Sequence, residues 1–214
     1  MEKTLSRKEF ILNAGERALG LVGIVAGAST LGSSCSPRQR EESSHTRIWG
    51  NEYKVMWRTY DWMGRETEYR ERFVDLEKDP DTPINSLEYR DSPFLVIQTK
   101  YAPLSETKTE QTRYSLTNYG YEHLRRGKKF EYRKQGHYEE EKVTFNSKGE
   151  VIEVIQDING DRKYDWREIP RWQQGEVKKV DFDLDMDGVT DTTVFERDVS
   201  SLRFKLEDNL KIKN

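Results

Sequence analysis

The sequence of 214 residues contains a single cysteine, Cys35, and only three histidines. One cysteine cannot form a disulfide within the chain, and no cysteine pair is available to hold a zinc ion. No apolar run reaches the roughly 20 residues that a membrane-spanning helix needs. The formal net charge is only −3. That balance excludes a broad basic surface, so we expect no nucleic-acid partner.

What the chain does contain favours a folded β protein. Aromatic residues make up 11% of it, which argues for ordered structure although 35% of the residues are charged. Short alternating or aromatic runs are separated by turn-forming residues, a pattern typical of antiparallel strands. We predict a mainly β fold, an antiparallel meander of short hairpins, with one short helix as an alternative to a strand at residues 66–76. In the C-terminal half the expected strands lie near residues 151–156, 164–169, 177–182, 192–196 and 202–206.

Two acidic segments near the C-terminus are copies of one unit. When the first segment is aligned with the second, the apolar residues Val151 and Val154 align with Val177 and Val180. A period in this range marks a repeated supersecondary unit, so we treat residues 151–196 as a tandem pair. The same alignment matches the acidic and amide side chains of the two segments, Asp157 with Asp183, Asn159 with Asp185, Asp161 with Asp187 and Asp165 with Asp191.

This spacing predicts calcium loops. Ca²⁺ takes six to eight oxygen ligands, and acidic side chains at alternating positions of a tight turn converge on one point. In the second loop the twelfth position is Val194, so water, Asp181 or Glu196 would complete the coordination. The expected ligands of the first loop are Asp157, Asn159, Asp161, the backbone carbonyl of Lys163, Asp165 and, at the twelfth position, Glu168. Those of the second loop are Asp183, Asp185, Asp187, the carbonyl of Val189 and Asp191.

The second loop, Asp-x-Asp-x-Asp-Gly-x-x-Asp over residues 183–191, resembles the calcium loops of dockerins, thrombospondin type 3 repeats and integrin-type propellers. The first loop resembles an EF-hand loop, except that Arg162 stands where the turn normally has glycine and Gly160 lies two residues earlier. The flanking residues favour strands, so we expect calcium-pinned β-hairpins rather than paired helices. The alternative is a pair of solvated acidic turns without metal.

The first 35 residues have the layout of an export signal, because basic residues precede an apolar stretch from Ala18 to Leu31. Residues 6–11 resemble the twin-arginine motif, with Lys8 in place of the second arginine. Residues 31–35 resemble a lipobox. These resemblances imply an exported lipoprotein, attached to a membrane of the cell envelope through Cys35. The alternative is an ordinary signal peptide with an incidental thiol.

We therefore divide the chain into a signal region (1–35), a flexible tether (36–47), an aromatic-rich β region (48–140) and a hairpin region with the acidic loops (141–214). We expect a calcium-binding protein, not an enzyme, in which Ca²⁺ stabilises a β module that binds a protein or glycan partner. One alternative is a calcium-stabilised envelope hydrolase with its active site in residues 48–140. Another is a calcium sensor. His123 and His137 lack the spacing of a zinc site, so we interpret them as surface residues.

Overall fold

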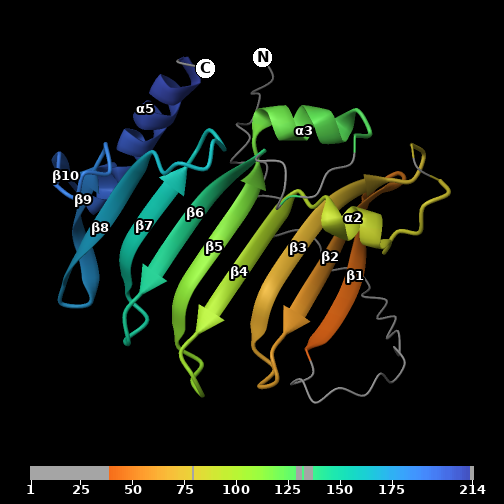
Figure 1. The fold of residues 1–214 in the computed structure, drawn as a ribbon, viewed down its shortest axis with the longest axis horizontal. Helices are drawn as coiled ribbons and strands as arrows, with labels where there is room; N and C mark the ends of the chain where they lie inside the picture. The colour runs from red at the N-terminus through yellow and green to blue at the C-terminus, as the bar shows by residue number, and fades with distance from the viewer. Residues whose placement is uncertain (1–38, 79, 129–131, 133–136, 213–214) are drawn as a thin grey trace.

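The structure is a computed structural model that describes residues 39–212 except 79, 129–131 and 133–136. Its centre is one open sheet of ten antiparallel strands, ordered as in the sequence (Figure 1). The sheet confirms the predicted fold class. The strands are β1 (Arg40–Trp49), β2 (Glu52–Tyr60), β3 (Glu66–Asp75), β4 (Leu95–Tyr101), β5 (Lys108–Leu116), β6 (Tyr138–Phe145), β7 (Val151–Asp157), β8 (Trp166–Gln173), β9 (Glu176–Asp183) and β10 (Thr192–Phe195).

The described α-helices are α2 (Leu87–Asp91), α3 (Asn118–Arg125) and α5 (Val199–Ile212), and a 3₁₀ turn, η1 (Glu196–Asp198), joins β10 to α5. Helix α2 lies in the connection between β3 and β4, and α3 in that between β5 and β6. In the part of the chain that the structure describes, no helix combines the length and the apolar character that crossing a membrane requires.

The two rims of the sheet differ. Tight turns, at residues 61–65, 102–107, 146–150 and 174–175, follow the even-numbered strands. The longer connections follow β3, β5, β7 and β9, and they occupy residues 76–94, 117–137, 158–165 and 184–191. Since the odd-numbered strands of a meander all run the same way, these connections share one rim, the upper one in Figure 1. Both acidic loops therefore lie on the same rim as α2 and α3.

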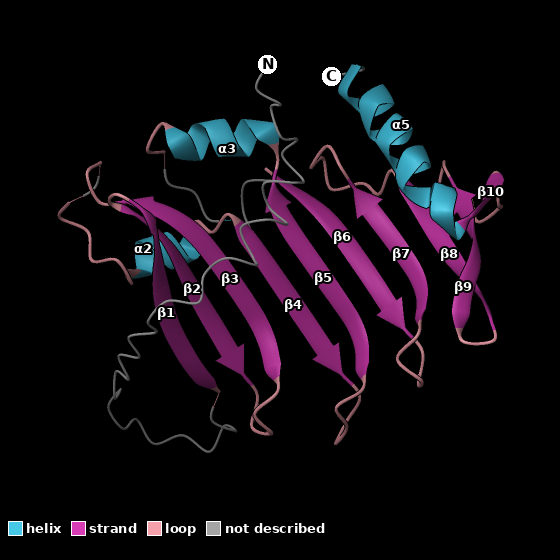
Figure 2. Ribbon diagram, turned by 180° about the vertical axis from the view of Figure 1, so that it is seen from behind, coloured by secondary structure: helices cyan, strands magenta, loops and turns pink. Residues whose placement is uncertain are grey.

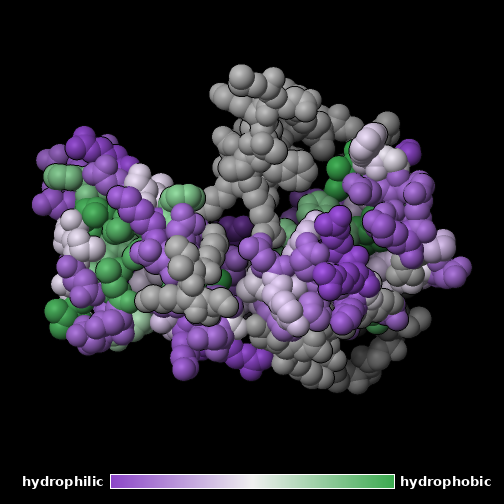
Figure 3. Space-filling view, turned by 90° about the horizontal axis from the view of Figure 1, so that it is seen from above, coloured by the Kyte–Doolittle hydropathy of each residue, from purple (hydrophilic) through white to green (hydrophobic). Residues whose placement is uncertain are grey.

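Helices cover opposite faces of the sheet at its two ends. On one face, Tyr89 of α2 packs with Val55, Trp57 and Val74, and a second cluster joins Leu124 of α3 to strands β4–β6. At the other end, α5 packs on residues of β8 and β9. Figure 1 shows α2 in front of the sheet, and the reverse view in Figure 2 shows α5 in front of β8. Figure 3, seen from above, shows hydrophobic residues gathered among hydrophilic ones at the end that carries α5.

Strand register explains this change of face. Tyr114 pairs with Val96 and with Glu140, and Glu140 pairs with Asp157, so these residues share a face. Gln156 pairs with Trp166. Because neighbouring residues of a strand point to opposite faces, Trp166 lies on the face opposite to Asp157. The face that α5 covers is therefore the one that α2 and α3 leave open.

Two predicted elements were wrong. The expected strand at 202–206 belongs to α5, whose apolar residues Val199, Leu202, Leu206 and Leu210 follow helical spacing. The expected tether at 36–47 was wrong for residues 40–47, which lie in β1 and pair along β2. As an edge strand β1 is almost entirely polar, and charged edge strands limit unwanted pairing. Because β1 is polar, it lacks the apolar alternation from which strands are predicted.

Residues 66–76 form strand β3 up to Asp75, not the short helix that the spacing of Tyr69, Phe73 and Leu76 allowed. Pairing with β2 and β4 on both sides outweighs that local pattern. The boundary predicted between residues 140 and 141 falls inside β6, and the hydrogen-bonded sheet is continuous across it.

Candidate metal centre

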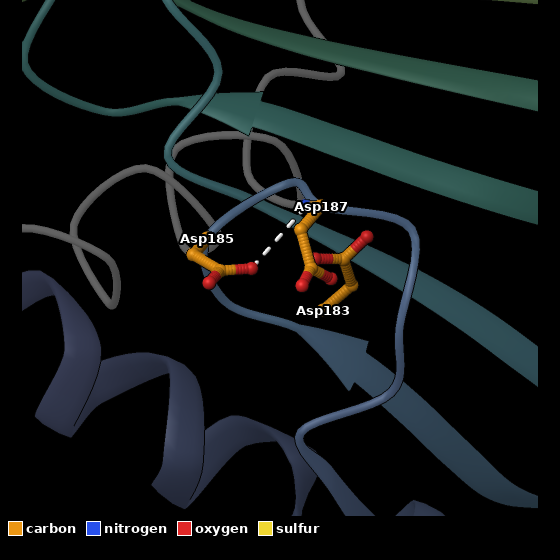
Figure 4. Close-up of side chains that lie close together, drawn as sticks. All are labelled: Asp183, Asp185 and Asp187. Carbon is orange, nitrogen blue, oxygen red and sulfur yellow. Dashed lines mark hydrogen bonds between the residues drawn. The ribbon is translucent and has the colours of Figure 1, made fainter.

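The second acidic loop, residues 184–191, connects β9 to β10 and brings three carboxylates together. Asp183 ends β9, and Asp185 and Asp187 follow in the loop. One carboxylate oxygen from each of the three lies within 4.8 Å of the other two. Figure 4 shows the three side chains directed toward a common region. Among the described residues this is the one group of three or more acidic, histidine or cysteine side chains with that geometry.

One oxygen of Asp183 is buried and unsatisfied. The side chain is 3% exposed. Its Oδ2 accepts the backbone N–H of Gly188 at 3.0 Å and lies 3.8 Å from Nη1 of Arg167. Its Oδ1 is buried without a hydrogen-bond partner. A buried acceptor left unsatisfied costs about 1–3 kcal/mol, and more when it is charged. The site therefore has an oxygen that could bind a cation and for which the described residues around it provide no hydrogen-bond partner.

Backbone N–H groups hold the other carboxylates of this loop in place. Asp185 Oδ1 accepts the N–H of Asp187 at 3.2 Å, and Asp187 Oδ1 accepts that of Val189 at 2.7 Å. Asp191 Oδ2 accepts the N–H of Leu184 at 2.6 Å, while the N–H of Asp191 donates to the carbonyl of Phe182 at 2.8 Å. Asp191 closes the base of the loop and does not belong to the group of three.

The first loop, residues 158–165 between β7 and β8, has the same hydrogen bonds at the equivalent positions. Five backbone N–H donors of the second loop have equivalents in the first loop, and so do their acceptors, but the first loop has a further bond from the N–H of Gly160 to Oδ1 of Asp157. The repeat seen in the sequence is therefore a repeat of backbone geometry. The bonds of the first loop run from Arg162 to Asp157, Asp161 to Asn159, Lys163 to Asp161, Ile158 to Asp165, and Asp165 to the carbonyl of Gln156.

Both loops contain two residues in the left-handed conformation, at the fourth and sixth positions. At the fourth position φ is +75° for Gly160 and +61° for Met186. At the sixth it is +70° for Arg162 and +91° for Gly188. Glycine adopts this conformation without strain, whereas other residues pay a steric cost. Each loop therefore has one glycine at one of these two positions, the fourth in the first loop and the sixth in the second. This explains why Arg162 stands where an EF-hand loop normally has glycine.

The first loop differs from the second at its buried aspartate. Asp157 is 2% exposed, and both of its carboxylate oxygens accept backbone N–H groups, Oδ1 from Gly160 and Oδ2 from Arg162, each at 2.7 Å. Burial raises the pKa of Asp157 and of Asp165, although hydrogen bonds from the backbone oppose the rise. The protein thus satisfies Asp157 with its own donors, while it leaves Asp183 Oδ1 without one.

Glu168, the predicted twelfth ligand of the first loop, lies on the opposite face from Asp157. It is 2% exposed and accepts Nε of Arg203 at 2.6 Å, a second bond from the same guanidinium, and Nε1 of Trp166 at 3.1 Å. The structure therefore does not bring Glu168 together with the other predicted ligands. An EF-hand places this glutamate on a helix that follows the loop, whereas here a strand follows and turns it toward α5.

The residues considered for completing the second loop have other surroundings. Asp181 accepts a hydrogen bond from Oγ1 of Thr193 at 2.7 Å and one from Nε of Arg171 at 2.6 Å. The hydrogen bond from Thr193 and the contact with Arg171 lower the pKa of Asp181 against the effect of burial. Glu196 lies exposed in η1. Neither belongs to the group formed by Asp183 and its neighbours.

The structure brings His123 and His137 together, which their separation in sequence gave no reason to expect. Their ring centroids are 5.9 Å apart, and Tyr119 lies 4.2 Å from His123 and 5.0 Å from His137. Helix α3 approaches closely because Gly120 has no side chain; a Cβ there would lie 2.8 Å from the carbonyl oxygen of His137. Burial, followed by the charge of Lys128, lowers the pKa of His123. No third ligand completes a metal group around them among the described residues.

A pocket of about 290 Å³ lies in the region considered for a hydrolase site, and Trp57 and several charged residues line it. Its carboxylates have basic partners. Glu68 accepts Nε of Arg70 at 2.8 Å, and Glu41 accepts Nη1 of Arg90 at 3.1 Å. Glycoside hydrolysis needs a pair of carboxylates that act as acid and base. These acidic side chains are instead bound in ion pairs.

In comparisons with known proteins, no family model, curated protein or solved structure matches the chain. Cys35, the predicted lipidation site, and the whole predicted signal region lie outside the described residues.

Proposed function

We propose that the protein is a calcium-binding protein whose principal site is the second acidic loop, with Asp183, Asp185 and Asp187 as side-chain ligands. The observation that carries this proposal is the buried, unpartnered Oδ1 of Asp183, in one of the three carboxylates of the acidic group. A bound cation would supply the missing partner. It would also offset the repulsion among three carboxylates that each have an oxygen within 4.8 Å of the others.

The donor set favours Ca²⁺ among biological cations. All of the ligands in the proposed site are oxygens, which hard cations prefer and for which zinc and copper compete less well. Ca²⁺ accepts six to eight oxygens in flexible geometry, so three carboxylates, the carbonyl of Val189 and water or Asp191 would suffice. Mg²⁺ is smaller and demands near-ideal octahedral geometry. A loop whose carboxylates already accept backbone hydrogen bonds is better suited to the larger ion.

The first loop is a second, weaker site in this proposal, with Asp157, Asn159, Asp161, Asp165 and the carbonyl of Lys163 as its ligands. Two features support the lower affinity. Both oxygens of Asp157 already accept backbone N–H groups. Asn159 supplies a neutral amide where the second loop has the carboxylate of Asp185. The first loop therefore has less to gain from a cation, because it carries fewer negative charges and because the oxygens of Asp157 already accept hydrogen bonds.

We further propose that the protein is exported and attached to the envelope membrane through Cys35. The arrangement of residues 1–35 supports this. Extracellular modules bind calcium with Kd values of about 0.1–1 mM, and tighter structural sites reach micromolar. A site at a free Ca²⁺ concentration of about 100 times its Kd stabilises the fold by about 2.7 kcal/mol. The ion would then act as a constitutive stabiliser of the hairpin from β9 to β10.

The partner in this proposal is a protein or a glycan that contacts exposed aromatic side chains. Trp49 is 82% exposed, Trp62 61% and Tyr119 59%. Aromatic side chains supply large contact areas in protein interfaces and stack on sugar rings. Trp49 ends β1 and Tyr119 lies in the connection that follows β5, so both share a rim with the acidic loops.

Calorimetric titration of Ca²⁺ into chelator-stripped protein tests the site. We expect binding that Asp187→Asn weakens by at least about tenfold, while the matched change in the first loop, Asp161→Asn, leaves the tighter event intact. Asp187→Asn removes one of three repelling charges, so the metal-free variant should be at least as stable as the parent. Mg²⁺ in place of Ca²⁺ should give much weaker binding. An absence of binding heat together with an unchanged melting temperature would refute the proposal.

A further inference from the structure

We propose that Ca²⁺ binding at the second loop and docking of the C-terminal helix α5 on the sheet are coupled, so that each strengthens the other. The inference rests on the proposed calcium site and adds its regulation. It starts from the apolar cluster on β8 and β9, against which residues of α5 and of both acidic loops pack. Figure 2 shows α5 crossing the end of the sheet that carries β8, β9 and β10.

The contact between α5 and the loops uses the same repeat position twice. Ile158 is the second residue of the first loop unit, and Leu184 is the second residue of the other. Both pack against one apolar cluster built on Trp166, Val180 and Phe182. The helix contributes to the same cluster with Val199, Leu202, Leu206 and Leu210. One stripe of α5 and one apolar residue from each loop thus pack on the same cluster.

Leu184 links this apolar contact to the ligands directly. It stands between Asp183 and Asp185, so the backbone that fixes its side chain also fixes theirs. Its N–H donates to Oδ2 of Asp191 at 2.6 Å, which closes the base of the loop. When Leu184 packs on the cluster that α5 completes, the backbone between two proposed ligands is held in place. When the loop opens, that contact is lost as well.

The connection between the second loop and α5 is short and consists of regular elements. Thr192–Phe195 forms β10, Glu196–Asp198 forms η1, and α5 begins at the next residue, Val199. Among the described strands, β10 is the last of the sheet and β9 is its one partner. The two strands are joined by the acidic loop itself. Loss of order in residues 184–191 would therefore free one end of β10 and disturb the start of α5.

A second anchor of α5 does not involve the loops. Arg203 donates Nε to Oε1 of Glu168 at 2.6 Å and makes a second bond to Oε2, and Glu168 is 2% exposed. This ion pair ties the helix to β8, whatever the state of the calcium site. Removal of Ca²⁺ should therefore loosen β10 and α5 without detaching the helix from β8, while the central strands remain folded.

Linkage makes the relation reciprocal, because the coupling free energy is the same whichever partner binds first. No residue of α5 belongs to the carboxylate group. A change in α5 that weakens docking should nevertheless weaken Ca²⁺ binding. Couplings of this kind typically change affinity by about 5–150-fold.

Hydrogen–deuterium exchange of the unmodified protein tests one direction. We expect Ca²⁺ to slow exchange in residues 192–210 at least about fivefold, and to leave β3–β5 unchanged. Asp187→Asn should abolish this protection, and Asp161→Asn should retain most of it. This measurement needs no variant of α5, so it stands even where a helix variant fails to fold.

Calorimetric titration of two α5 variants tests the other direction. Leu206→Ala removes a side chain from the apolar cluster, and we expect it to weaken the Kd for Ca²⁺ by about 5–10-fold. Phe204→Ala is the matched control on the same helix, because Phe204 is 63% exposed, and it should leave the Kd unchanged. Calcium binding with no protection of α5 and equal Kd values in both variants would overturn the coupling but not the site. No calcium binding at all would overturn both.

Discussion

The two acidic loops share a backbone and differ in what their buried aspartates contact. Five equivalent hydrogen bonds and two left-handed residues recur at the same positions of both loops. Asp157 has a backbone N–H for each of its oxygens, whereas Asp183 has one oxygen without a partner. The two loops therefore have the same backbone conformation but different side-chain contacts at the buried aspartate. In a tandem unit the function has to be read from the side-chain contacts of each copy.

The twelfth position separates the loops most strongly. Glu168→Ala should lower the free energy of unfolding by about 3–5 kcal/mol, because it leaves the guanidinium of Arg203 without its buried partner. Its equivalent in the second loop is Val194, an apolar residue of the α5 cluster. Chemical denaturation measures the loss. We expect it to be as large with chelator as with Ca²⁺; a loss confined to the calcium-containing samples would identify Glu168 as a ligand.

The aspartate at the start of each loop should respond differently to calcium. At 100 times the Kd, Ca²⁺ should stabilise the parent protein by about 2.7 kcal/mol. Asp183→Asn should remove most of that increment, since it replaces a ligand charge at the unpartnered oxygen. Asp157→Asn should retain most of it. Denaturation curves with and without Ca²⁺ give both increments, and equal losses in the two variants would show that the loops are equivalent sites.

Exchanging the glycine positions should have the smallest effect. Arg162→Gly and Met186→Gly should each stabilise the protein by about 0.5–1 kcal/mol, because glycine removes the steric cost of a positive φ. Gly188→Ala should cost about 1 kcal/mol, and only through the backbone, since an added Cβ there meets no atom within 4 Å. Melting temperatures of the metal-free proteins measure these changes. A stabilising Gly188→Ala would contradict the assigned turn.

Sequence reasoning predicted the meander and the tandem loops because both depend on local patterns. Alternation marked most of the strands, and the alignment of the two acidic segments marked the repeat without any structure. The helical spacing of Leu202, Leu206 and Leu210 is also present in the sequence, but a further strand of the meander was predicted at residues 202–206 instead. Strand β1 was concealed because an edge strand needs no apolar face.

The contacts that distinguish the loops could not be predicted from sequence. The burial of Asp183 depends on strands and a loop packed around it, and its lack of a partner is a property of the folded site. The fate of Glu168 depends on Arg203, which lies 35 residues further along the chain. The analogy with an EF-hand assumed that a helix follows the loop, and a strand reverses the direction of that side chain.

A crystal structure determined with Ca²⁺ tests the central claim most directly. We predict one strongly occupied ion in the second loop, about 2.3–2.6 Å from Oδ1 of Asp183 and coordinated by Asp185 and Asp187, with weaker occupancy or none at Asp157. An ordered second loop without an ion, in which Oδ1 of Asp183 accepts a hydrogen bond from the protein, would contradict it.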